Sequence, residues 1–235
     1  MKAFLLAAGL GTRLKPLTDH TPKCLVNICG KPLLAWWIDL FEEHGIEEVL
    51  INLHHLPDQV ITFIEACKSN IKFRYFYEDK LLGSAGTLRQ NKEFVKNENS
   101  FFICYADNLT NYNLTEFFSF HKKNKSLFSM ALFRTNQPTT KGIAVLDAKD
   151  IVIDFKEKPA NPASNLANAG IYISSREVLE IIPELEVTDI GFHLLPKLIG
   201  RMDGWESKDY LIDIGIHLDL AKAEIEWKNL IEGNL

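Results

Sequence analysis

A glycine-rich loop with basic side chains follows the first apolar segment of the chain. It reads Ala7-Ala8-Gly9-Leu10-Gly11-Thr12-Arg13 and continues to Lys23. Glycines let backbone N–H groups approach an anion closely, and successive N–H groups form an anion-binding nest. Arg13 adds a fork of donors for phosphate oxygens, and Lys23 adds a point charge. The loop therefore predicts a phosphate site.

Two familiar phosphate motifs are excluded at this loop. A Walker sequence, GxxxxGK followed by Ser or Thr, is absent, and Leu14 occupies the third glycine position of the dinucleotide fingerprint GxGxxG. A nicotinamide dehydrogenase is therefore disfavoured. The glycines alone fit equally well a simple turn at the end of a strand, with a solvated arginine beside it.

A carboxylate follows a later apolar run. Asp107 comes directly after residues 101–106, a segment that predicts a buried strand. Ligands of open α/β sheets bind at the carboxyl ends of the strands. Mg²⁺ is held by one or two carboxylates together with phosphate oxygens, so Asp107 is a candidate metal ligand. The alternative is an Asp-Asn turn that ends the strand.

The elements that must position these residues alternate along the first half of the chain. Apolar runs, periodicity and Gly/Pro breaks predict strands at 2–8, 48–53, 71–77 and 101–106, with helices at 32–44, 57–68 and 87–94. This alternation indicates βαβ units, a mostly parallel sheet and right-handed crossovers. The second half predicts strands at 129–134, 142–146, 151–155 and 169–173, and helices at 114–123, 176–182, 191–199 and 217–230. We expect one domain with two lobes.

Composition restricts the partners. The 235 residues carry a formal net charge of −5, which argues against bulk nucleic-acid binding. The four cysteines lack zinc-site spacing and predict reduced thiols. Neither a secretory signal nor an apolar stretch of about 20 residues is present, so we expect a cytoplasmic protein that does not enter a membrane.

The loop motif Gly-x-Gly-Thr-Arg at residues 9–13, followed by Pro22-Lys23, resembles the sugar-phosphate nucleotidyltransferases. That family includes mannose-1-phosphate guanylyltransferase, glucose-1-phosphate thymidylyltransferase and uridylyltransferases. The resemblance spans essentially the whole chain, because later motifs follow in the family's order. It implies a Rossmann-like mixed, mostly parallel α/β sheet flanked by helices. It also implies an enzyme that transfers a nucleotidyl group from an NTP to a sugar 1-phosphate with Mg²⁺. About 1–113 would form the nucleotide-binding half, and about 114–235 the sugar-phosphate-binding half.

The resemblance also assigns roles to residues. Arg13 and Lys23 would be catalytic, and Asp107 with Asp213 would hold the metal. The nucleotide would contact Ala7, Ala8, Gly9, Gly11, Thr12, Arg13, Gly83, Gly86 and Asp107. The sugar phosphate would contact Gly142, Glu157, Lys158 and Asn168. The family usually has glycine before the first metal-binding aspartate, where this chain has Ala106.

The choice of substrates rests on one position. Pyrimidine-specific members often carry Gln where this chain has Leu81, which favours GTP with mannose 1-phosphate or a heptose 1-phosphate. The alternative is uridylyl or thymidylyl transfer to glucose 1-phosphate or N-acetylmuramate 1-phosphate. A different class of function, a non-catalytic sensor of nucleotide or sugar phosphate, would also fit this fold. The oligomeric state is left unpredicted.

Overall fold

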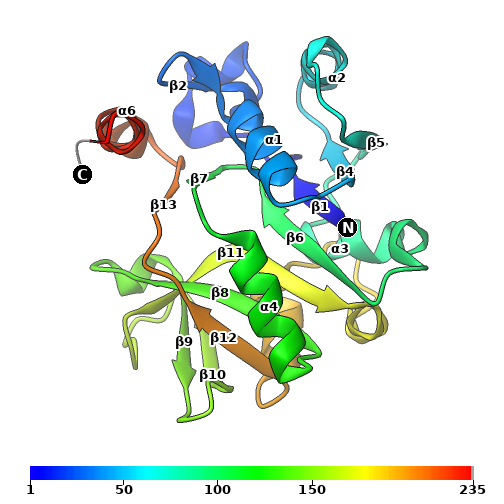
Figure 1. Cartoon of the computed structure of the whole chain (residues 1–235), viewed down its shortest axis with the longest axis vertical. Coiled ribbons are helices and arrows are strands. Elements are labelled where there is room, and N and C mark those ends of the chain that lie inside the picture. Colours follow the sequence, from blue (N-terminus) through cyan, green and yellow to red (C-terminus); the bar gives the residue numbers. More distant parts are fainter. Residues whose placement is uncertain (234–235) are drawn as a thin grey trace. The chain divides into compact units, whose positions relative to one another are not determined.

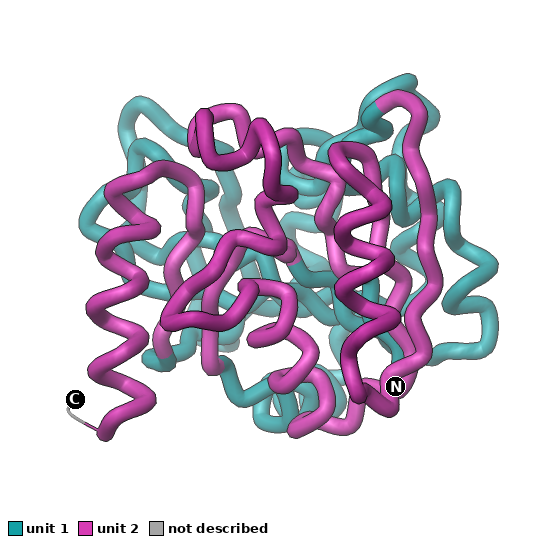
Figure 2. Tube along the Cα trace, turned by 90° about the horizontal axis from the view of Figure 1, so that it is seen from above, with its two compact units in different colours: residues 1–4, 81–104, 112–209 teal, residues 5–80, 105–111, 210–235 magenta. Residues whose placement is uncertain are grey.

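The computed structural model describes residues 1–233 and contains a mixed α/β sheet with helices packed on it (Figure 1). By contact the chain divides into two compact units (Figure 2). Unit 1 comprises residues 1–4, 81–104 and 112–209, and unit 2 comprises residues 5–80, 105–111 and 210–235. Each unit combines segments that are distant in sequence. The expected assignment of 1–113 and 114–235 to different substrates therefore stays a prediction.

Unit 1 is organised around one long strand, β11 (Leu166–Ser175), which is antiparallel to β6, β8 and β9. β9 is antiparallel to β10, and β8 is parallel to β12. Helix α4 packs against β8 and β12 (Figure 1). The other strands are β6 (Ser100–Tyr105), β8 (Phe128–Arg134), β9 (Gly142–Leu146), β10 (Val152–Glu157) and β12 (Met202–Glu206). The helices are α3 (Ser84–Gln90), α4 (Leu114–Asn124) and α5 (Leu195–Leu198), with 3-10 turns at Lys92–Val95, Pro138–Thr140 and Arg176–Ile181 and a π-helical turn at Ile190–Leu194.

Unit 2 contains the expected βαβ arrangement, in which α2 (Pro57–Ala66) connects the parallel strands β4 (Glu48–Leu53) and β5 (Lys72–Tyr77). Strand β1 (Lys2–Leu6), of which only the last two residues belong to unit 2, is the neighbour of β4. Two short ladders complete the unit: β2 (Asn27–Ile28) with β3 (Lys31–Pro32), and β7 (Asn108–Thr110) with β13 (Leu211–Asp213). The remaining elements are α1 (Leu33–Glu43), α6 (His217–Ile231) and 3-10 turns at Thr12–Leu14, Leu17–Asp19 and Lys23–Leu25.

Helix α1 shows why this sequence forms the core of unit 2. Its apolar residues recur every three or four positions, so Leu34, Trp37, Ile38 and Phe41 share one buried face. Pro32 precedes the first turn, where its missing N–H costs no hydrogen bond, and Gly45 follows the end with φ +68°. The indole of Trp37 donates to the carbonyl of Asn108 at 2.8 Å. The helix thereby fixes the backbone beside Asp107.

Most expected elements are confirmed within one or two residues, and the differences are local. The helix expected at 87–94 begins earlier, as α3 at Ser84, and its last part is a 3-10 turn. The helix expected at 176–182 is a 3-10 turn, and the one at 191–199 is a π turn followed by α5. Strands β7, β12 and β13 were not expected. In the part of the chain that the structure describes, no helix combines the length and the hydropathy that a membrane crossing requires.

Candidate functional site

The glycine loop of unit 2 is held by buried polar contacts at its start. The backbone N–H of Ala7 donates to Asn52 Oδ1 at 2.7 Å, and Asn52 Nδ2 donates to Glu78 Oε1 at 2.8 Å. Asn52 and Glu78 are both buried. A buried amide and a buried carboxylate that satisfy each other fix the point where the loop leaves β1. Neither residue was predicted from the sequence, because each resembles an ordinary polar side chain at the end of a strand.

Farther along, the loop folds back on itself at Gly11. Gly11 has φ +62°, and a Cβ there would lie 2.9 Å from Thr18 Cγ2. The Thr18 hydroxyl donates to the Gly11 carbonyl at 2.8 Å, and His55 Nε2 lies 2.7 Å from the Thr18 carbonyl. Gly9, by contrast, has nothing within 4 Å of the position its Cβ would take. The loop is thus pinned at Gly11 and open at Gly9, as a backbone anion site requires.

Lys23 brings the two predicted metal ligands together. Its Nζ lies 2.6 Å from Asp107 Oδ2 and 3.6 Å from Asp213 Oδ1, and its side chain is only 10% exposed. The β7–β13 ladder aligns Asp213 with Asn108, and the N–H of Ile214 donates to the Asp107 carbonyl at 2.9 Å. Strands more than 100 residues apart therefore converge on one charged cluster.

Arg13 reaches the same cluster. A Cβ added to Gly215 would lie 3.2 Å from Arg13 Nη2 and 3.3 Å from Asp213 Oδ1. The structure therefore gathers Arg13, Lys23, Asp107 and Asp213 in unit 2, beside the glycine loop. These are both predicted catalytic residues and both predicted metal ligands.

The donor set of this cluster suits a hard cation with open positions. Within residues 1–233 no group of three or more His, Cys, Asp or Glu side chains is placed to bind a metal. With Lys23 and Arg13 beside them, the two carboxylates belong to a cluster of zero formal net charge. Mg²⁺ is commonly bound by one or two carboxylates and completes its shell with water and phosphate oxygens. Asp107 and Asp213 fit that requirement.

The residues predicted for the sugar phosphate all lie in unit 1, where Gly142 borders the carboxylate of Glu157. Glu157 pairs in register with Gly142 across β10 and β9. A Cβ at Gly142 would lie 2.5 Å from Glu157 Oε2, and one at Gly191 would lie 2.8 Å from the same oxygen. Burial raises the pKa of Glu157, Lys158 and Lys141 lower it, and Asp189 raises it. The two glycines leave room for one half-buried carboxylate.

Asn168 is displayed by an irregularity in β11. The register between β11 and β8 shifts between Asn168 and Tyr172, and Gly170 has φ +69°. The side chain of Asn168 accepts from Gly170 N at 2.9 Å and donates to Tyr172 Oη at 2.6 Å. The amide is therefore fixed in orientation, with unused donor and acceptor capacity for a hydroxyl.

Gly83 and Gly86, predicted to border the nucleobase, also belong to unit 1. Gly83 has φ +77°, and a Cβ there would lie 2.5 Å from the Thr188 carbonyl. Asp189 and Gly191 lie in the same region and were missed by the sequence analysis. The available signal was an aspartate ahead of an apolar helical run, which is a typical helix N-cap.

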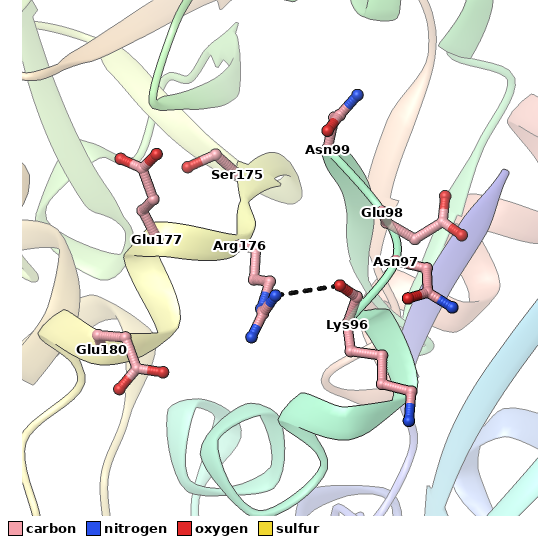
Figure 3. A pocket seen from close by; sticks show the side chains of 8 residues that line it. All are labelled: Lys96, Asn97, Glu98, Asn99, Ser175, Arg176, Glu177 and Glu180. Carbon is pink, nitrogen blue, oxygen red and sulfur yellow. Dashed lines mark hydrogen bonds between the residues drawn. The ribbon is translucent and has the colours of Figure 1, made fainter.

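A separate pocket in unit 1 holds none of the predicted residues. It measures about 420 Å³ and mixes charges of both signs, and Arg176 Nη1 donates to the Lys96 carbonyl at 3.1 Å across it (Figure 3). Its lining residues are Lys96, Asn97, Glu98, Asn99, Ser175, Arg176, Glu177 and Glu180. With two cations against three carboxylates, the pocket offers no net attraction for a phosphate.

Comparison with known proteins agrees with this arrangement. Residues 2–228 match the family model described as nucleotidyl transferase. The chain is 29% identical to mannose-1-phosphate guanyltransferase 2 of Candida glabrata, over 93% of the chain and 65% of that protein. It is 30% identical to UTP–glucose-1-phosphate uridylyltransferase of Synechocystis, over 98% of the chain and 60% of that protein. The chain thus spans about two thirds of the length of these curated relatives or less.

Solved structures extend the likeness to the fold. HddC from Yersinia pseudotuberculosis, complexed with GMP-PN, superposes with a TM-score of 0.82 at 26% identity. The match covers 96% of this chain and 99% of HddC. The family model covers nearly the whole sequence, so the chain belongs to the nucleotidyl transferase family.

Proposed function

We propose that the chain transfers a nucleotidyl group from an NTP to a sugar 1-phosphate and releases pyrophosphate. The observation that carries this proposal is the cluster of Lys23, Asp107, Asp213 and Arg13 beside an open glycine loop. A loop that presents backbone N–H groups next to cations and paired carboxylates is suited to a polyphosphate and a divalent cation.

The reaction requires charge neutralisation more than proton transfer. A sugar phosphate is already ionised at neutral pH, so its oxygen attacks the α-phosphorus without a general base. Two unit charges 4 Å apart repel by about 4 kcal/mol at an effective dielectric of 20. Lys23 faces the α-phosphate and offsets this repulsion, and Arg13 binds the outgoing phosphates. Asp107 and Asp213 would hold Mg²⁺, which would supply further positive charge to the phosphate oxygens.

The other substrate is held by shape and hydrogen bonds. The Glu157 carboxylate accepts from sugar hydroxyls, Asn168 offers a donor and an acceptor, and Lys158 pairs with the sugar phosphate. Positioning of two anionic substrates in line is the main contribution of such a pocket.

Guanylyl transfer to mannose 1-phosphate or a heptose 1-phosphate is the specific reaction we infer. Leu81 at the position of the pyrimidine-reading Gln, and the GMP-PN complex of HddC, support a guanine nucleotide. The guanyltransferase among the relatives supports mannose 1-phosphate, whereas the uridylyltransferase supports the glucose alternative. Four free cysteines and an acidic net charge support a cytoplasmic enzyme that does not bind nucleic acid.

A pyrophosphate-release screen tests this proposal. Four NTPs are each combined with the 1-phosphates of mannose, a heptose, glucose and N-acetylmuramate, with Mg²⁺ present. Release is expected to be fastest with GTP and mannose 1-phosphate or the heptose 1-phosphate. Fastest release with UTP or dTTP would overturn the base preference. Binding of nucleotide without release from any pair would favour the sensor.

The metal assignment is tested by Asp107→Asn and Asp213→Asn. Each variant keeps the shape of the side chain and removes its charge, so Mg²⁺-dependent turnover should be abolished while the circular dichroism spectrum is unchanged. Asp219→Asn is the matched control, because Asp219 lies on α6 outside the cluster. Full activity in either of the first two variants would exclude that aspartate as a metal ligand.

A further inference from the structure

The segment predicted to border the nucleobase is clamped to a second segment, residues 188–191. The N–H of Thr188 donates to the Leu82 carbonyl at 2.8 Å. In return the Thr188 carbonyl accepts from Ala85 at 2.9 Å and from Gly86 at 3.0 Å. Thr188 is fully buried, and the Cβ of any larger residue at Gly83 would collide with its carbonyl. Neither segment can shift without the other.

Asp189 extends this clamp through both of its carboxylate oxygens. Its Oδ2 accepts from the Ser84 hydroxyl at 2.8 Å, and the Ser84 oxygen accepts from Ile190 N at 2.8 Å. Its Oδ1 accepts from Gly191 N at 2.7 Å and from Phe192 N at 3.2 Å. An ordinary helix N-cap needs only one of these oxygens. The other joins the cap to the segment of Ser84.

Gly191 also lies beside the carboxylate of Glu157, which is predicted to contact the sugar phosphate. The position of a Gly191 Cβ lies 3.2 Å from Asp189 Oδ1 and 2.8 Å from Glu157 Oε2. Asp189 also contributes to the raised pKa of Glu157, which places the two carboxylates within electrostatic reach. A continuous set of contacts therefore runs from Ser84 through Asp189 and Gly191 to Glu157, wholly within unit 1.

We propose that Asp189 is a positioning residue that couples the nucleobase-bordering segment to the sugar-phosphate pocket through Ser84 and Gly191. The inference rests on the proposed function and deepens it. Asp189 touches neither substrate; it sets the place of Gly191 and so the room around the Glu157 carboxylate. A change at Ser84, on the nucleotide side, should then alter binding of the sugar phosphate.

Three substitutions isolate this link. Ser84→Ala removes the hydroxyl between Asp189 and Ile190. Asp189→Asn keeps an acceptor for Gly191 but replaces the oxygen that accepts from Ser84 with an NH₂ donor. Ser84→Thr keeps the hydroxyl and serves as the conservative rescue. The assay uses the full chain with the NTP and sugar 1-phosphate that react fastest in the screen.

The Ser84→Ala and Asp189→Asn variants should each raise the KM for the sugar 1-phosphate roughly five- to tenfold, with kcat changed less than twofold. The double variant should resemble either single variant, because both break one link, and such contacts are not additive. Ser84→Thr should return KM to the wild-type value. A purely structural role would lower the melting temperature and leave KM unchanged, and that result overturns the proposal. Multiplied effects in the double variant would also overturn it.

Calorimetric binding separates this inference from the proposed function. The same four sugar 1-phosphates are titrated into wild type and Ser84→Ala without an NTP turning over. Binding that weakens in Ser84→Ala supports the coupling even if no pyrophosphate is ever released, in which case only the proposed reaction is wrong. Equal binding to the two proteins overturns the coupling and leaves the reaction standing. Failure of wild type to bind any of the four sugars overturns both.

Discussion

The two groups of predicted site residues are built in opposite ways. In unit 2 the phosphate cluster depends on side-chain charge: one nearly buried ammonium joins two carboxylates, with a guanidinium beside them. In unit 1 the region predicted for the sugar depends on the absence of side chains, because Gly142 and Gly191 leave space around Glu157. In the same unit, hydrogen bonds to Gly170 and Tyr172 orient Asn168.

The difference matches what each region would recognise under the proposed function. Triphosphates share a charge pattern, so point charges and backbone N–H groups are sufficient to bind them. Sugars differ by the direction of single hydroxyls, which charge does not distinguish and which a shaped pocket does. Variants should therefore fail differently: loss of charge should lower kcat, whereas loss of space should raise the sugar KM.

The largest effect is expected at Lys23. Lys23→Met keeps the apolar stem and removes the ammonium that we propose faces the α-phosphate. Loss of one transition-state donor usually costs about 10²–10³ in kcat. Pyrophosphate release measures it, and Lys68→Met, an exposed lysine of the same unit, is the control. A variant that loses only affinity for the NTP would place Lys23 in binding and break the comparison.

A tenfold effect of the other kind is expected at Gly142. In Gly142→Ala the new methyl would meet Glu157 Oε2 at 2.5 Å and Phe155 Cζ at 2.7 Å. Overpacking costs about 1–3 kcal/mol. About 1.4 kcal/mol of this cost taken from sugar binding raises the sugar KM about tenfold, with kcat nearly unchanged.

Gly204→Ala is the matched control for that substitution. Gly204 lies on β12, where a methyl would crowd Leu146 and Leu132 at 2.5 and 2.7 Å, away from Glu157. It should lower the melting temperature and leave the sugar KM unchanged. If both alanine variants raise the sugar KM equally, crowding acts through general instability. The space at Gly142 would then have no specific role in sugar binding.

The smallest effect is a pH dependence at Glu157. Because burial raises its pKa above the ordinary 4.5, the carboxylate takes up a proton at a higher pH than an exposed glutamate does. The sugar KM of wild type should then rise as pH falls through that raised pKa, by about fivefold for one lost hydrogen bond. The ratio of wild type to Glu157→Gln, measured across pH, cancels titration of the sugar phosphate. A flat ratio would show that Glu157 does not contact the sugar.

The sequence predicted the fold well where periodicity was strong and local. Strands β4 and β9 have the predicted bounds, α1 is one residue shorter at each end, and α6 extends one residue beyond its predicted end. Strand β13 was missed because three residues carry no periodic signal, and only pairing with β7 makes them a strand. The turn at Ile190–Leu194 was expected as regular helix and is a π turn, whose N-cap Asp189 also accepts a hydrogen bond from the distant Ser84.

The site residues show the same contrast between local sequence signals and distant contacts. Asp107 was predicted from its place at the end of an apolar run, and Arg13 and Lys23 from the loop. Asn52 and Asp189 carry no motif of their own, because their roles come from partners 45 and 105 residues away. Residues proposed to contact a ligand are thus easier to predict from the sequence than residues that hold them in place.

The buried Trp37 gives this molecule a built-in optical probe. Its indole donates to the carbonyl of Asn108, the residue next to Asp107, and is 2% exposed. The polarity around an indole N–H sets its fluorescence emission maximum. Occupation of the carboxylate cluster would therefore shift the emission of Trp37. Ligand arrival could then be followed in the unlabelled chain on the time scale of mixing, with Trp36, Trp205 and Trp227 replaced by Phe to leave a single emitter.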